Sequence, residues 1–160
     1  MIISGRGSLL RPSPSSYTRD GKVSEAKFWK HIKDHVGHNG HWDRIESHST
    51  SQGRPDVNVC LEGVVVDIEL KVYDPRKGGF VLRANQNAWI GNHIRANGRV
   101  FIFARYGDQA SRQYLLIPGR CARNLIHDRS YEGWLNQAAY VWDKEVNWEQ
   151  FLRVLKGTEN

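Results

Sequence analysis

The sequence predicts an α/β domain in which a mixed β-sheet is covered by helices. The main observation is a β-hairpin across Gly53–Val72, where two runs rich in Val, Ile and Leu are separated by the turn-forming pair Glu62-Gly63. A second observation is that a segment with helical apolar spacing lies on each side of this hairpin. A third is a set of short apolar runs nearer the C-terminus, each as long as a typical strand.

The segments in front of the hairpin predict an arm, a helix and a strand. Residues 1–19 are rich in Ser, Pro, Gly and Arg, so we expect a flexible basic arm, either packed on a partner or simply disordered. We expect residues 20–160 to form one domain. Apolar spacing predicts a helix over Gly21–Val36, which Gly37 ends, and alternation predicts a strand over Trp42–Ser47.

The segments after the hairpin predict a helix over Ala84–Asn97 and strands over Arg99–Arg105 and Arg112–Pro118. A strand-like run at Ala139–Trp142 lies between two further short helices. The core order is therefore αβββαβ. Because a helix lies between the hairpin and the next strand, we expect that connection to be a crossover to a parallel strand.

The loop at Glu62-Gly63 sets the register of the hairpin. A two-residue loop places Asp56 opposite Glu69, and Val, Ile and Leu side chains then share one face. The opposite face carries Arg54, Asp56, Asn58, Asp67, Glu69 and Lys71. Carboxylates directly opposed on a sheet repel each other. A divalent cation between Asp56 and Glu69 would remove this repulsion.

Asp56, Glu69 and Lys71 suit metal-assisted hydrolysis of a phosphodiester. Carboxylate oxygens are the ligands that Mg²⁺ or Mn²⁺ prefers, and such an ion polarises a phosphoryl oxygen and activates water. An ammonium group on the same face can orient the water or neutralise developing charge. The alternative is a surface hairpin in which Lys71 and Glu69 form an ordinary ion pair worth about 0–1 kcal/mol.

Pro55-Asp56 followed by Glu69-Leu70-Lys71 resembles the motif of the PD-(D/E)XK nuclease superfamily. The wider pattern R-I-E-S…G-R-P-D…I-E-L-K…R-x-x-Q-x-x-W, between Arg44 and Trp89, is most similar to the VRR-NUC branch, whose virus-encoded members stand alone. The resemblance covers about Glu25 to Arg105. It implies a restriction-endonuclease-like core.

The resemblance also implies roles for individual residues. Asp56 and Glu69 would bind the metal together with the backbone carbonyl of Leu70, and Lys71 would be the catalytic lysine. Asp67 lies outside the motif, and we interpret it as a solvated strand residue near the turn.

Glu25 and Gln86 are less firmly indicated by their own spacing. Glu25 lies at the edge of the apolar stripe of the first helix, so it is either a surface charge or an acid pointing inward. The resemblance matches it to a first-helix glutamate that binds metal through water or binds a second metal. Gln86 is a polar residue near the start of the next helix, and the resemblance places it near the lysine and the attacking water.

The net charge of +6 favours a polyanionic partner, with nucleic acid the first choice. Basic residues also gather in the loops around the hairpin. We expect them to contact DNA phosphates, although a solvated basic rim is the alternative. They are Arg54, Arg76, Lys77, Arg83 and His48.

Histidines and cysteines give weaker signals. Four histidines cluster near the end of the first helix, and a zinc site there is conceivable, but their spacing favours solvated side chains. They are His31, His35, His38 and His41. Cys60 and Cys121 lack a disulfide framework, which favours a reducing, cytoplasmic setting (host cytoplasm if virus-encoded). We expect no membrane partner and no organic cofactor, and interpret the tryptophans as core or dimer packing.

These observations predict an Mg²⁺- or Mn²⁺-dependent endodeoxyribonuclease. The resemblance implies branched or Holliday-junction DNA as a substrate and a homodimer that makes paired cuts. Two alternatives remain open: a nuclease on flap, single-stranded or linear DNA, and a noncatalytic module that binds nucleic acid.

Overall fold

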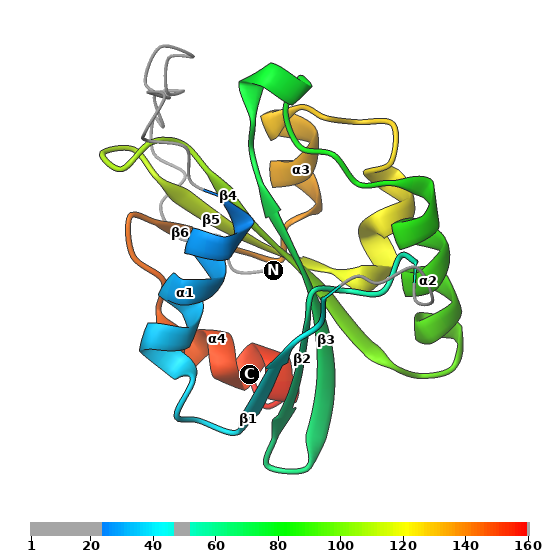
Figure 1. The fold of residues 1–160 in the computed structure, drawn as a ribbon, viewed down its shortest axis with the longest axis vertical. Coiled ribbons are helices and arrows are strands. Elements are labelled where there is room, and N and C mark those ends of the chain that lie inside the picture. Colours follow the sequence, from blue (N-terminus) through cyan, green and yellow to red (C-terminus); the bar gives the residue numbers. More distant parts are fainter. Residues whose placement is uncertain (1–23, 47–51, 160) are drawn as a thin grey trace.

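The structure is a computed structural model that describes residues 24–46 and 52–159 (Figure 1). It contains a six-stranded mixed sheet flanked by helices. In chain order the elements are α1 (Glu25–Val36), β1 (His41–Arg44), β2 (Val57–Leu61), β3 (Val64–Val72), the 3₁₀ helix η2 (Pro75–Lys77), α2 (Ala84–Arg95), β4 (Arg99–Tyr106), β5 (Gln113–Pro118), the 3₁₀ helix η3 (Gly119–Asn124), α3 (Tyr131–Gln137), β6 (Tyr140–Asp143) and α4 (Trp148–Lys156).

The strands lie in the sheet in the order in which they occur in the chain. Every neighbouring pair is antiparallel except β3 and β4, which are parallel and are joined through α2. The predicted crossover is therefore confirmed. Six strands with a single parallel pair also confirm the mixed sheet.

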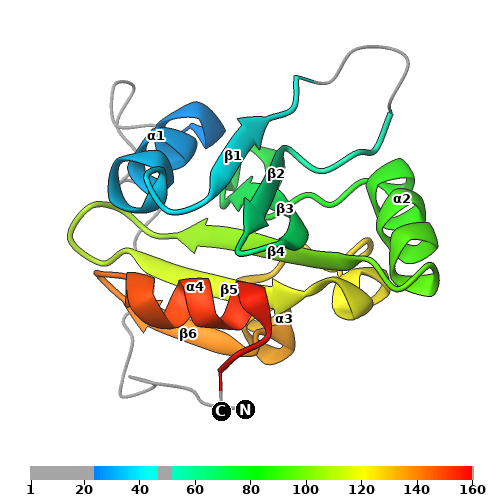
Figure 2. The same cartoon turned by 90° about the horizontal axis from the view of Figure 1, so that it is seen from below.

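Helices cover both faces of the sheet and enclose two apolar cores (Figure 2). On one face, α1 and α4 pack on the inward side chains of the hairpin, with Phe28 and Phe151 both against Phe103. On the other face lie α2, η3 and α3, where Trp134 stacks on Phe80. Within the described ranges, no helix combines the length and the apolar character needed to cross a membrane.

The predicted elements are present, with small shifts at their ends. The first helix begins at Glu25, and the strand that follows it ends at Arg44. The short 3₁₀ helices η2 and η3 were not predicted, because three to six residues are too few to show a periodicity. All six tryptophans pack in or against the two cores, which confirms their packing role. The predicted arm over residues 1–19 lies outside the described residues.

The hairpin turn has the conformation that its register requires. Glu62 and Gly63 both have positive φ angles, of 49° and 82°, as in a type I′ turn. Leu61 pairs with Val64, and Asn58 pairs with Asp67. The predicted register is thus confirmed from the Val57–Ile68 pair to the turn, and Asp56 directly precedes this paired region.

Replacing Gly63 tests how much this turn depends on its left-handed backbone. Because a Cβ atom at Gly63 would meet nothing within 4 Å, only the backbone penalty is added. We expect Gly63→Ala to lower the free energy of unfolding by about 1–2 kcal/mol, measured by urea denaturation. Gly63→Asn, which tolerates positive φ better, is the control and should lose less. Equal losses in the two variants would contradict this explanation.

Candidate active site

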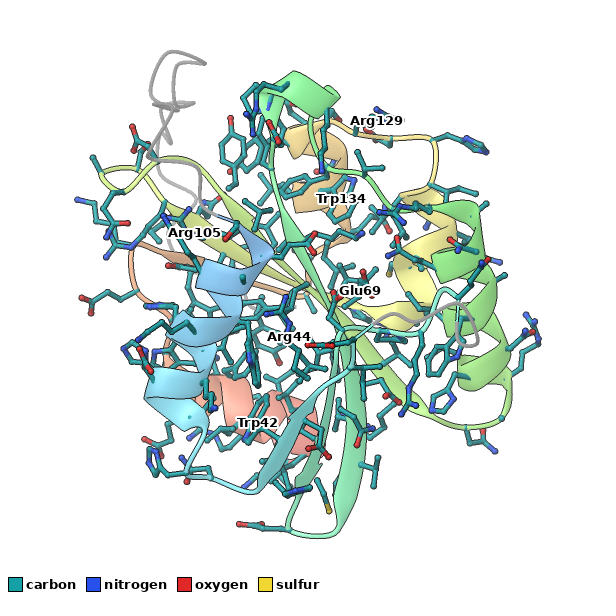
Figure 3. All side chains as sticks on the ribbon, in the orientation of Figure 1. Trp42, Arg44, Glu69, Arg105, Arg129 and Trp134 are labelled. Atoms are coloured by element: carbon teal, nitrogen blue, oxygen red, sulfur yellow. The ribbon has the colours of Figure 1, made fainter. Side chains whose placement is uncertain are left out.

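The acidic motif lies where β2 begins beside the middle of β3. Asp56 immediately precedes β2, and its Oδ2 accepts a hydrogen bond of 2.9 Å from the backbone amide of Leu70. The Leu70 side chain is buried in the core, so its neighbours Glu69 and Lys71 project from the other face of the strand. Figure 3 shows Glu69 between α1 and α2. The predicted register therefore brings Asp56, Glu69 and Lys71 together.

Gln86, in the first turn of α2, joins the acid to the lysine. Its Nε2 donates to Glu69 Oε1 at 2.8 Å, and its Oε1 accepts from Lys71 Nζ at 3.0 Å. Lys71 Nζ is also 3.3 Å from Glu69 Oε1. The same Gln86 oxygen accepts from the backbone amide of Arg83, which caps the start of α2. One side chain thus fixes the helix end and orients the charged pair.

The two oxygens of Glu69 have different surroundings. Oε1 receives the bonds from Gln86 and Lys71, whereas Oε2 is buried without a hydrogen-bond partner in the described structure. The residue is only 1% exposed. Burial and the nearby Asp56 carboxylate hold the pKa of Glu69 well above its usual range, and the ion pair with Lys71 offsets this only in part. A buried carboxylate oxygen without a partner is costly unless a cation or proton occupies it.

Glu25 reaches the same site from the opposite layer. It is the first residue of α1, whose N-cap Ser24 accepts a hydrogen bond from the amide of Lys27. Its side chain keeps contact with solvent, yet partial desolvation and then Asp56 raise its pKa. Across the described residues, however, no three His, Cys, Asp or Glu side chains converge closely enough to hold an ion together. Glu25 is thus an electrostatic neighbour of the two motif acids.

A cleft of about 440 Å³ opens over this cluster. Its walls include the three acids, Lys71 and Gln86, and also Gly53, Arg54 and Arg83. Gly53 has a φ of +88°, and a Cβ atom there would lie 2.3 Å from the carbonyl oxygen of Asn85. Only glycine lets the segment leading to Asp56 approach α2 so closely. The sequence analysis did not predict this role of Gly53, although a glycine shortly before Pro55-Asp56 can indicate a close approach of the backbone.

The predicted phosphate-binding residues divide into separate groups. Arg54 and Arg83 line the cleft, and Arg54 Nε is buried without a partner in the described structure. Lys77 lines an adjoining cavity. Arg76 instead bonds to Asp74, the N-cap of η2, and lines neither space. His48 lies outside the described residues.

Asp67 differs from its predicted solvated state. It is 3% exposed, and its two oxygens bond to Asn58 Nδ2 at 3.0 Å and His93 Nε2 at 3.1 Å. His93 is held by α2 and stacks on Trp89, so the helix covers the end of the hairpin that was interpreted as open to solvent. The prediction was wrong because strand alternation does not reveal which polar face a later helix covers.

The histidines near the end of α1 contact aromatic residues. His31 stacks on Tyr114, and His35, which is exposed, stacks on Trp148. His38 contacts Asn39, and His41 Nδ1 lies 3.7 Å from Asp43. Cys60 and Cys121 are both free thiols.

The sequence matches no protein-family model and no curated protein. The nuclease interpretation therefore depends on the motif residues and on the geometry described above.

The raised pKa of Glu69 predicts how the stability of the metal-free protein changes with pH. Above the ordinary pKa of a glutamate and below the raised one, the folded state holds a proton that the unfolded state has lost. Stability should therefore fall as pH rises through this window, by at most about 1.4 kcal/mol per pH unit for one group. Urea unfolding in EDTA at several pH values measures this slope.

Glu69→Gln is the matched variant for this measurement. It keeps the size of the side chain and removes its titration, so the Glu69 contribution to the slope should disappear. The slope that remains combines Glu25, whose raised pKa acts with the same sign, and His31, whose lowered pKa acts with the opposite sign. Equal slopes in the wild type and in Glu69→Gln would contradict the assignment of the raised pKa.

Proposed function

We propose that this protein is an Mg²⁺- or Mn²⁺-dependent endodeoxyribonuclease with a restriction-endonuclease-like core, related to the VRR-NUC branch of the PD-(D/E)XK superfamily. The observation that carries the proposal is the buried Oε2 of Glu69, which has no hydrogen-bond partner among the described residues and lies near the Asp56 carboxylate. A structural ion pair would explain Oε1, which Lys71 and Gln86 contact, but it leaves Oε2 without a role.

The side chains fit a hard divalent cation. Asp56 and Glu69 would supply carboxylate oxygens, and the Leu70 carbonyl is a further candidate ligand because Leu70 follows Glu69 and its own amide binds Asp56. Glu25 could take part through water. When bound, such an ion supplies a Lewis acid for the phosphoryl oxygen and lowers the pKa of water.

Lys71 and Gln86 would then act on the reacting groups. Lys71 is only 6% exposed, and Gln86 Oε1 holds its ammonium group in one orientation at the cleft. There it can neutralise negative charge that develops on the phosphoryl oxygens. Gln86 would position this ammonium, because it donates to Glu69 Oε1 and accepts from Lys71 Nζ.

The cleft also supports DNA as the substrate. Arg54 and Arg83 border the acids, and Arg54 Nε has no partner within the described residues. A guanidinium group placed there suits a phosphate next to the scissile bond. Selectivity for branched or Holliday-junction DNA, paired cutting by a homodimer and a cytoplasmic setting belong to the proposal through the family resemblance.

Two substitutions in the motif test the proposed chemistry. Asp56→Asn removes a ligand charge and Lys71→Ala removes the ammonium, so each should lower Mn²⁺-dependent cleavage by at least 100-fold. DNA affinity measured in EDTA should change little in Asp56→Asn. Lys71→Ala also removes a cation from the cleft wall, so its DNA affinity should fall, but far less than its cleavage rate. The measurement is a cleavage panel of four-way junction, flap, linear duplex and single-stranded DNA.

The exposed residue Glu149 of α4 offers a control, since Glu149→Gln alters a surface charge that lines neither the cleft nor the adjoining cavity. Cleavage by Glu149→Gln should equal that of the wild type. If the wild type cut none of these substrates in Mg²⁺ or Mn²⁺ yet still bound DNA, the protein would be a noncatalytic binding module.

A further inference from the structure

A second cavity, of about 310 Å³, adjoins the acidic cleft and has a different character. The two spaces share Glu25, Lys71 and Arg83. The second is also lined by Lys77 and Arg129, so four cations face a single acid. Figure 3 labels Arg129 on the segment that leads into α3, far along the chain from the motif.

Among the described residues, only Lys71 of these four cations is ion-paired, with its Nζ 3.3 Å from Glu69 Oε1. In the part of the chain that the structure describes, Lys77, Arg83 and Arg129 form no ion pair with a carboxylate. Two other arginines do: the exposed Arg76 is bound to Asp74, and the half-buried Arg153 to Glu149. Positive charge left unpaired in a concave space is a typical anion-binding arrangement.

Hydrogen bonds to backbone carbonyl groups hold the walls of the cavity in place. Arg129 Nη1 donates to the carbonyl oxygen of Lys77 at 2.7 Å, and the Arg129 carbonyl accepts from the amide of Phe80 at 3.0 Å. Gly79 has a φ of +124°, and a Cβ atom there would lie 2.1 Å from the same carbonyl. Phe80 is fully buried against Trp134. The turn and Arg129 therefore form one rigid wall, and little ordering is needed when an anion binds.

We infer that this cavity is a subsite for a DNA phosphate next to the phosphate at the Asp56–Glu69 site, with Arg129 and Lys77 as its specific ligands. The inference rests on the proposed nuclease function. Arg129 can bind phosphate oxygens in a fork, and Lys77 adds a point charge. Because Lys71 and Arg83 border both spaces, consecutive phosphates of one strand can contact this shared wall.

DNA affinity measured in EDTA tests the subsite without requiring cleavage. Fluorescence anisotropy of a labelled duplex gives the dissociation constant and its dependence on salt. Arg129→Gln and Lys77→Gln should each weaken binding roughly tenfold and reduce the salt slope by about one. Arg123→Gln is the matched control, since it removes one exposed charge from η3 and lines neither space; it should stay within about twofold of the wild type.

Two variants and a stability measurement separate a loss of DNA affinity from a loss of folding. Lys77→Gln alters a side chain that makes no hydrogen bond within the described residues, and Arg129→Lys retains the charge but loses the fork. Arg129→Lys should recover part of the affinity that Arg129→Gln loses. Lys77→Gln should unfold at the urea concentration of the wild type, and because Arg129→Gln also loses the bond to the Lys77 carbonyl, its affinity is compared with that of Lys77→Gln.

Two further experiments distinguish whether an internal phosphodiester or a terminal phosphate of the DNA binds in the cavity. One neutral methylphosphonate is placed in turn at each phosphate flanking the mapped cut, and one position should slow wild-type cleavage about tenfold but have no added effect in Arg129→Gln. Duplexes with a 5′-phosphate or a 5′-hydroxyl are compared in parallel. An effect at an internal position assigns a phosphodiester to the cavity, and an effect of the 5′-phosphate alone assigns a terminal phosphomonoester.

The inference would be overturned if Arg129→Gln and Lys77→Gln behaved like Arg123→Gln in affinity and salt slope. A wild type that bound DNA without cutting it would instead refute the proposed nuclease function, and the affinity results would still decide on the subsite. The two failures are therefore distinguishable.

Discussion

The burial of the Glu69 carboxylate is the constraint on which the arrangement of the site depends. Removing a carboxylate from water is unfavourable, and a second acid beside it adds repulsion. The protein compensates one oxygen with Lys71 and Gln86 and leaves the other without a partner in the described structure. Gln86 in turn depends on the start of α2, which lies close because Gly53 lacks a side chain. The positions of Lys71, Gln86 and Gly53, in three different segments, thus all affect the surroundings of the Glu69 carboxylate.

The hairpin was the part of the fold most open to prediction from sequence. A two-residue turn fixes the register, and strand alternation then assigns every side chain to a face. The proximity of the site residues on this hairpin, Asp56, Glu69 and Lys71, therefore follows from local sequence spacing. The helices were also visible from their apolar stripes, although their ends were set by caps such as Ser24 that periodicity alone does not reveal.

Contacts between distant segments could not be predicted in the same way. Asp67 lies on the polar face of its strand, and its burial follows from His93 on a helix that packs there later in the chain. Arg129 meets Lys77 across 52 positions, so no local pattern connects the two. Arg76 and Asp74 are close in the sequence, but a count of charges does not show that Arg76 is paired with an acid and not free. Sequence spacing therefore predicted the proximity of the acids better than the surroundings of the basic residues.

We propose a divalent-cation site at Asp56 and Glu69, and anomalous diffraction from crystals grown with Mn²⁺ can locate the ion. We expect an anomalous peak between the two carboxylates, about 2.1 Å from Glu69 Oε2, the oxygen that has no partner among the described residues. Crystals of Asp56→Asn should lack this peak or show it much weakened. Crystals grown in saturating Mn²⁺ that show no peak there, or that bind manganese only at the histidines near the end of α1, would contradict a cation site at Asp56 and Glu69.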